Sequence, residues 1–106
     1  MPHIEFNGKK YELNEEGFLT YPEEWNKDIA ILLAKQEEGI EELTEAHWAV
    51  INYIRQYYLE NKLAPMVRKI CQNTGIQLKG IYDLFPSGPA QGACKLAGLP
   101  KPDGCV

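Results

Sequence analysis

The sequence predicts an α+β fold, in which a short N-terminal β-meander packs against an array of about five helices and a flexible C-terminal arm follows. Near the start, alternating apolar and polar residues flank an Asn-Gly pair, the strongest short-range signal for a hairpin. Apolar residues then recur at helical spacing between Gly and Pro residues, and the last residues are rich in Gly and Pro. At 106 residues, 1–106 is expected to be a single domain, with 98–106 as the mobile arm.

The meander is expected to begin with two short strands within residues 4–13, joined through Asn7 and Gly8. Residues 14–17 predict a second turn, and residues 18–20 a third short strand. So small a sheet is not stable alone, so its apolar face should pack on the helices.

Five helical segments are expected to follow, each with a local signal for its start or its end. The first runs from Pro22 to Gly39, and the second is capped by Thr44 and runs to about Glu60. The third is opened by Pro65 and closed by Gly75, and it carries Met66, Val67, Ile70 and Cys71 on one side. The fourth must stop before Pro86 and carries Leu78, Ile81, Leu84 and Phe85, and the fifth covers residues 90–97 and carries Cys94.

The composition is that of a soluble globular protein, with 44% hydrophobic and 25% charged residues. No apolar run approaches the length of a membrane span and the start lacks the pattern of a secretory signal, so we expect a cytoplasmic protein. Three cysteines in a reducing compartment favour redox or carrier chemistry over a structural disulfide framework. Together with His3 and His47 they match no metal-ligand spacing, so no metal site is predicted.

Charge is distributed unevenly along the chain, although the net charge is only −4. Residues 1–60 hold thirteen acidic and five basic side chains, whereas residues 61–106 hold two acidic and six basic ones. Arg68 and Lys69 lie in a stretch from Lys62 to Lys79 that contains no acidic residue. This stretch is either a solvated basic helix face or a docking surface for an anionic partner.

The C-terminal segment carries Cys105 one position before the last residue, eleven positions after Cys94. Pro100 and Pro102 favour extended backbone between the two cysteines, and glycines near each end of this stretch supply bendable points. Fully extended, eleven steps span roughly 36 to 40 Å. The arm could therefore enter a cleft of a partner protein, or fold back and bring the two sulfurs together.

These residues resemble the DsrC family, the so-called gamma subunit of dissimilatory sulfite reductase, which is related to the TusE sulfur relay proteins. The motifs that carry the resemblance are Leu84-Phe85-Pro86-Ser87-Gly88-Pro89, the stretch from Ala93 to Pro102, and Gly104-Cys105-Val106. Trp25, Thr44 to Trp48, Pro65-Met66-Val67-Arg68 and Asn73-Thr74-Gly75 extend the resemblance over the whole chain.

The resemblance implies that the protein is a sulfur carrier and a co-substrate, without turnover of its own. In the family the cysteine at the position of Cys105 enters the siroheme site of the reductase and accepts a partly reduced sulfur as a persulfide. The upstream cysteine, here Cys94, then joins it as a disulfide or trisulfide, which a membrane-bound redox complex reduces. The implied partners are the reductase alpha and beta subunits, that complex and sulfurtransferases, and the chain itself would hold no cofactor. The presence of Cys94 indicates the two-cysteine branch, whereas the one-cysteine relatives serve tRNA thiolation.

Alternatives remain for each of these residues. Cys105 could be an incidental exposed thiol and Cys94 a small buried residue. Cys71, on the apolar face of the third helix, is expected in the protein core. Lys95 and Lys101 add positive charge to the predicted arm.

The basic residues support either of two partners. Arg68, Lys69, Lys79 and Lys101 would dock the reductase, with the carboxylates of siroheme attracting the arm. The rival hypothesis is a helix-turn-helix that binds nucleic acid through Arg68, Lys69 and Lys79, and the acidic overall charge argues against it.

Overall fold

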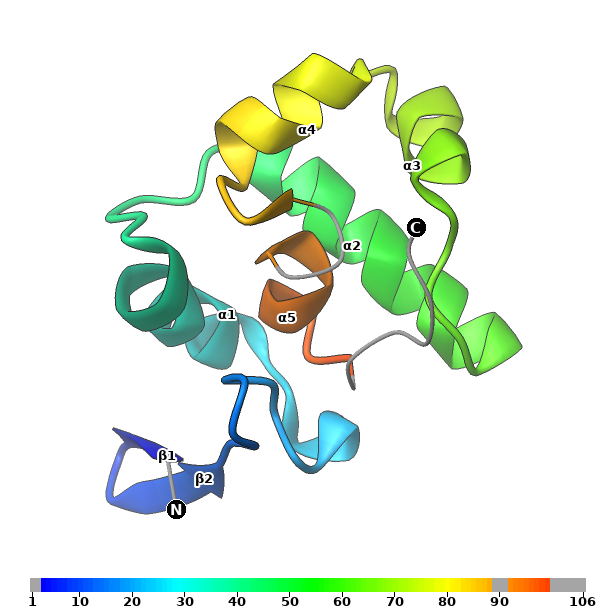
Figure 1. Ribbon diagram of the computed structural model, residues 1–106. Helices are drawn as coiled ribbons and strands as arrows, with labels where there is room; N and C mark the ends of the chain where they lie inside the picture. The colour runs from blue at the N-terminus through cyan, green and yellow to red at the C-terminus, as the bar shows by residue number, and fades with distance from the viewer. Residues whose placement is uncertain (1–2, 89–91, 100–106) are drawn as a thin grey trace.

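The computed structural model describes residues 3–88 and 92–99 and confirms the α+β architecture. Its elements are β1 (His3–Phe6), β2 (Lys9–Glu12), a 3-10 turn (Pro22–Glu24), α1 (Lys27–Leu33), a π-helical turn (Ala34–Glu38), α2 (Glu45–Asn61), α3 (Val67–Thr74), α4 (Leu78–Leu84) and α5 (Cys94–Leu96). In Figure 1, α5 lies between α1 and α2, and it packs against both. None of the helices in the described part of the chain is long and apolar enough to cross a membrane.

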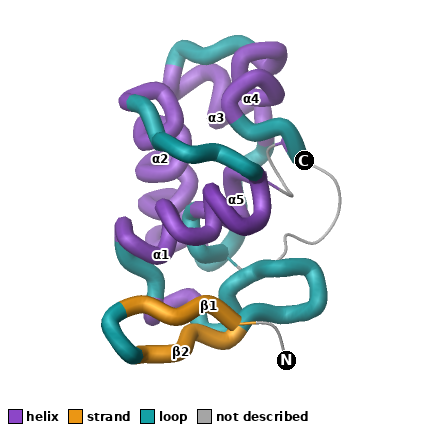
Figure 2. Tube along the Cα trace, turned by 90° about the vertical axis from the view of Figure 1, so that its left-hand side faces the viewer, coloured by secondary structure: helices purple, strands orange, loops and turns teal. Residues whose placement is uncertain are grey.

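The N-terminal hairpin forms as the sequence predicts. β1 and β2 are antiparallel, with Ile4 opposite Tyr11. Asn7 and Gly8 both have positive φ, 52° and 79°, as the tight turns of two-residue hairpins require. Ile4 and Tyr11 are buried, so this face of the hairpin packs on the helical body. Figure 2 shows the hairpin at one end of the molecule, away from α3 and α4.

The expected third strand at residues 18–20 is wrong. Among the described residues the sheet has two strands, and this segment joins them only through an isolated bridge between Leu13 and Leu19. The side-chain oxygen of Asn14 accepts hydrogen bonds from the backbone N–H groups of Glu16 and Phe18, at 2.9 and 3.0 Å. In a strand, successive side chains point to opposite faces of the sheet. Here the chain closes into a turn, and two consecutive side chains, those of Phe18 and Leu19, are both buried, so no strand forms.

The expected single helix from Pro22 to Gly39 is broken near its start. Pro22–Glu24 form one 3-10 turn, after which Trp25 adopts extended backbone. Asn26 then begins α1 as its N-cap, because its side chain accepts from the N–H of Ile29 at 3.0 Å. Gly39 ends the segment with a positive φ of 68°, as predicted.

The longest helix, α2, forms the spine of the structure. Thr44 caps it as predicted, and His47 completes the cap because its Nδ1 accepts from the Thr44 N–H at 3.0 Å. The proton of His47 is therefore on Nε2, which donates to the backbone oxygen of Leu84 at 2.9 Å. His47 thus ties the start of α2 to the end of α4.

Helices α3 and α4 stop at Gly75 and before Pro86, as predicted. Two details of the expected apolar faces are wrong: Met66 is the 59% exposed N-cap of α3, and Leu78 at the start of α4 is 49% exposed. Each helix is too short to bury more than its central side chains, and Ile70 and Ile81 fill that role.

Candidate thiol site on α5

The thiol of Cys94 lies in the core. Cys94 is 0% exposed, and its neighbours Ala93, Leu96 and Ala97 are equally buried. Burial disfavours the charged thiolate and raises the pKa of Cys94 to about 12. Because the thiolate is the nucleophile, Cys94 becomes reactive only when it leaves this apolar environment. In this structure Cys94 is a small buried residue, as the alternative expects, and its reactive role stays a prediction.

The backbone after Cys94 turns sharply out of α5 in a Schellman motif. Gly98 takes a left-handed conformation with φ 78° and donates to the Lys95 oxygen at 3.1 Å. The Leu99 N–H donates to the Cys94 oxygen at 3.2 Å. Gly98 and Leu99 belong to the sequence-predicted arm, yet both are buried in the body.

Two distant side chains bind the next two carbonyls. Trp25 Nε1 donates to the Leu96 oxygen at 2.8 Å. Arg55 on α2 donates from one nitrogen to the Ala97 oxygen at 3.2 Å and from another to the Pro22 oxygen at 2.8 Å. Its guanidinium lies 4.9 Å from the centre of the Trp25 ring, and burial lowers the pKa of Arg55 below its usual value.

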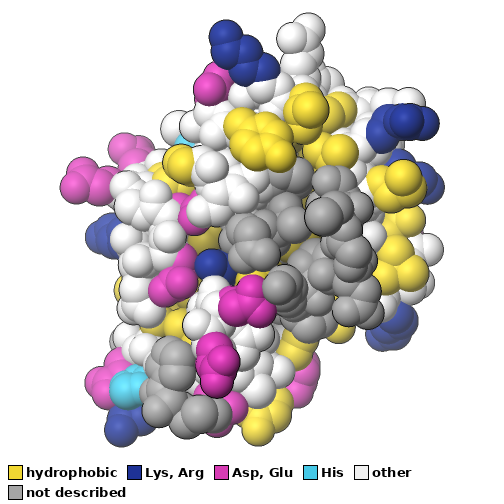
Figure 3. All heavy atoms as spheres, viewed as in Figure 1, with side chains coloured by type: hydrophobic (Ala, Val, Ile, Leu, Met, Phe, Trp, Pro, Cys, Tyr) yellow, Lys and Arg dark blue, Asp and Glu magenta, His cyan; other side chains and the backbone are white. Residues whose placement is uncertain are grey.

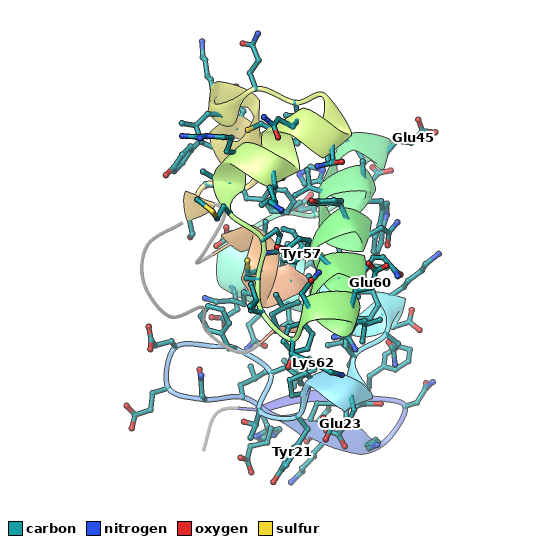
Figure 4. The ribbon with its side chains drawn as sticks, turned by 90° about the vertical axis from the view of Figure 1, so that its right-hand side faces the viewer. Tyr21, Glu23, Glu45, Tyr57, Glu60 and Lys62 are labelled. Atoms are coloured by element: carbon teal, nitrogen blue, oxygen red, sulfur yellow. The ribbon has the colours of Figure 1, made fainter. Side chains whose placement is uncertain are left out.

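The turn that Arg55 reaches lies beside the second half of α2. Figure 4 shows Tyr21 and Glu23 on this turn, below the stretch of α2 that carries Tyr57 and Glu60. Arg55 thus connects α2, the 3-10 turn and the end of α5. The sequence alone does not reveal these contacts of Arg55, because its partners lie 33 and 42 positions away.

Two carboxylates of the π-helical turn hold the chain on either side of residues 89–91. Glu38 accepts from the Ser87 N–H at 3.1 Å and from the Ser87 hydroxyl at 2.6 Å. Glu37 pairs with Lys95 at 3.5 Å, and the Lys95 ammonium also lies 5.2 Å from the centre of the Phe18 ring. Lys95 is only 7% exposed, so the expectation that it adds charge to a solvated arm is wrong.

The other sequence-predicted residues are distributed as follows. Arg68 and Lys69 on α3 and Lys79 on α4 are exposed, while Cys71 is half-buried against the core. Figure 3 shows Lys and Arg side chains along the edge formed by α3, with Asp and Glu gathered toward α1 and the hairpin. Cys105 and Lys101 lie outside the described residues. Within 3–88 and 92–99, no group of three His, Cys, Asp or Glu residues could hold a metal ion.

Comparison with known proteins decides the family. The model for "DsrC like protein" matches residues 5–106. The chain belongs to the DsrC family. It is 45% identical to the dissimilatory-type sulfite reductase subunit gamma of Nitratidesulfovibrio vulgaris over 106 residues, which cover all of both chains. It is also 45% identical to the sulfurtransferase TusE of Photorhabdus laumondii, over 95% of this chain and 96% of that one.

Solved structures of the family share the fold. The oxidized gamma subunit of dissimilatory sulfite reductase from Archaeoglobus fulgidus superposes with a TM-score of 0.88 at 46% identity, covering 99% of this chain and all of that one. A solution structure of the corresponding Pyrobaculum aerophilum protein gives a TM-score of 0.84 at 45% identity, covering 99% of this chain and 95% of that one. The relatives named here are sulfur-transfer or sulfite reductase proteins, and they lend no support to the helix-turn-helix alternative.

Proposed function

We propose that this chain is a sulfur carrier and co-substrate of a dissimilatory sulfite reductase, in which Cys105 accepts sulfur as a persulfide and Cys94 then joins it. The observation that supports this proposal is the family match over residues 5–106, a range that spans both cysteines. The match to a gamma subunit of the reductase over its full length supports the same partner.

The burial of Cys94 supports the order of the two roles. A protonated thiol with no exposed surface cannot receive sulfur directly from a partner's active site. Cys105 is therefore the acceptor, and Cys94 acts second, once the segment that buries it has opened.

The sulfur carried on Cys105 can react with Cys94 in either of two ways. When the Cys94 thiolate attacks the Cys105 sulfur of the persulfide, a Cys94–Cys105 disulfide forms and hydrosulfide leaves. When the sulfur arrives on Cys105 still bearing a hydroxyl group, attack on that sulfur instead forms a trisulfide and releases water. A membrane-bound redox complex would supply four electrons, and with four protons the trisulfide would return to the two thiols and release its central sulfur as sulfide.

Docking would use the exposed basic residues. Arg68, Lys69 and Lys79, with Lys101 in the C-terminal segment, would approach the reductase alpha and beta subunits in the cytoplasm. The chain would hold no cofactor of its own, and the siroheme of the partner would supply the reduced sulfur. Sulfurtransferases are the corresponding sulfur donors suggested by the TusE relatives.

The test is the intact mass of the protein after incubation with the reductase, sulfite and an electron donor. The parent chain should gain sulfur that a thiol reductant removes. Cys105→Ala should gain none, whereas Cys94→Ala should gain sulfur without forming the intramolecular link. Cys71→Ala is the matched control and should behave as the parent. Loading of Cys105→Ala together with no loading of Cys94→Ala would reverse the proposed order.

A further inference from the structure

The end of α5 and the turn that follows it, residues 94–99, are held on the body by side chains from elsewhere in the chain. A helix of three residues has no stability of its own, and the last carbonyls of any helix lack partners within the helix. The Schellman motif satisfies the first two carbonyls of residues 94–97. The other two accept from Trp25 and Arg55.

Packing adds to these hydrogen bonds. Gly98 lies so close to Trp25 that a Cβ added at this position would overlap the indole ring. Leu96 and Leu99 are completely buried, and Cys94 is buried with them. A reagent can therefore reach the sulfur of Cys94 only after residues 94–99 have moved away from the body.

Residues 94–99 can move in this way while the rest of the structure stays folded. Helix α2 packs on α3, α3 packs on α4, and α1 packs on β1, through contacts that do not involve this segment. Segments with few backbone bonds of their own open locally at a lower free energy than the whole fold does. Opening must break the bonds from Trp25 and Arg55 and expose two leucines, so the closed state dominates.

We propose that Trp25 and Arg55 form a latch that keeps Cys94 unreactive, and that local opening of residues 94–99 against this latch controls when the thiol reacts. The latch protects the second thiol from oxidants while the first is still empty, and so keeps the two reactions in order. This inference rests on the proposed function, because it explains why Cys94 acts second.

The loss of one latch contact should favour the open state by the net strength of that contact. Arg55 is charged, and a hydrogen bond from a charged donor is stronger than one between neutral groups. Arg55→Met should therefore raise the open population about tenfold. Trp25→Phe removes a neutral N–H but keeps an aromatic ring beside Gly98, so it should raise the open population about fivefold.

A change at Gly98 tests the same latch from the opposite side of the contact. In Gly98→Ala the new Cβ would overlap Trp25, and a left-handed φ of 78° is unfavourable for a residue with a side chain. Both costs disappear when residues 94–99 leave the body. Gly98→Ala should therefore raise the open population at least as much as Arg55→Met does.

Alkylation of Cys94 by iodoacetamide measures the open population. Cys71 and Cys105 are replaced by Ala in every protein, so that Cys94 is the only thiol. In the open state the Cys94 thiolate attacks the reagent, forms a carbon–sulfur bond and displaces iodide. The observed rate, divided by the rate for the same protein unfolded in urea at the same pH, gives the fraction of molecules that are open.

Two control variants separate the latch from general stability. Ile70→Val removes one buried methyl group from α3, so it should lower the free energy of global unfolding without changing the alkylation rate. Lys27→Met removes an exposed ammonium that also lies over a tryptophan ring, that of Trp48, and should leave the alkylation rate unchanged. In the parent this rate should depend little on low urea concentrations, because local opening exposes little surface.

The outcomes separate this inference from the proposed function, because the assay needs neither Cys105 nor the reductase. A parent in which Cys94 reacts only at the rate of global unfolding would overturn the latch. So would an Arg55→Met variant, folded by circular dichroism, whose rate stays within about twofold of the parent or rises only in proportion to its loss of global stability. If Arg55→Met does not fold, Trp25→Phe decides, and an unchanged rate in that variant overturns the inference. Failure of the parent chain to accept sulfur would refute the proposed function and leave these rates as measured.

Discussion

Cys94 should make the folded protein lose stability at alkaline pH. Burial raises the pKa of Cys94 from 9.0 to about 12, so the folded state holds this proton more tightly than the unfolded state does. The contribution of the Cys94 thiol to the free energy of unfolding is therefore fully present below about pH 9, and it is lost as the pH rises toward 12. At about pH 10.5, a shift from 9.0 to about 12 corresponds to a loss of about 2 kcal/mol.

The measurement is urea unfolding of the parent and Cys94→Ala, with a thiol reductant, at about pH 8 and about pH 10.5. Other groups also titrate in this range, so the informative quantity is the difference between the two proteins. The parent should be the more stable protein at pH 8, because its sulfur fills space in the core. That advantage should shrink by about 2 kcal/mol at pH 10.5.

Cys71→Ala provides the control, since it removes a half-buried thiol and keeps the buried one. It should show the same alkaline loss as the parent. If the parent and Cys94→Ala lose equal stability between the two pH values, the reasoning that Cys94 is held protonated by burial is refuted.

Three further predictions concern the pairing of thiols, a buried charge and docking. Mild oxidation should link Cys94 to Cys105 within one chain, and peptide mapping that finds Cys71 in the dominant disulfide would contradict this. Glu37→Gln should cost about 3 kcal/mol of unfolding free energy, because it leaves the Lys95 ammonium buried without its partner. Lys95→Met removes that charge and should cost under about 1 kcal/mol. Thermal or urea unfolding measures both variants, and equal costs would argue against a stabilising Glu37–Lys95 pair. Replacing Arg68 and Lys69 by Glu should weaken capture of the reductase more at low salt than at high salt, because salt screens the attraction between charges. An effect independent of salt would show that these charges do not attract the reductase.

Local signals in the sequence predicted much of the fold because they act between near neighbours. The Asn7-Gly8 turn, the Thr44 cap and the stop at Gly75 each depend on residues within one turn of chain. The error at Pro22–Glu24 arose where two local signals compete. Apolar spacing carries one helix through this segment, whereas the side chain of Asn26 caps a new helix by accepting from Ile29.

By itself, the sequence determined the α+β class, the family resemblance and the two thiols eleven positions apart, because composition, turn chemistry and motifs are properties of the chain. Only the tertiary structure decided what surrounds Cys94. This thiol is buried, the neighbouring Lys95 is paired with Glu37, and the end of α5 is bound by Arg55 and Trp25. These contacts join residues 42 to 71 positions apart, in the case of the α5 carbonyls. Hydrophobic periodicity indicates which face of an element is buried, but it carries no information on which distant donor meets a particular carbonyl.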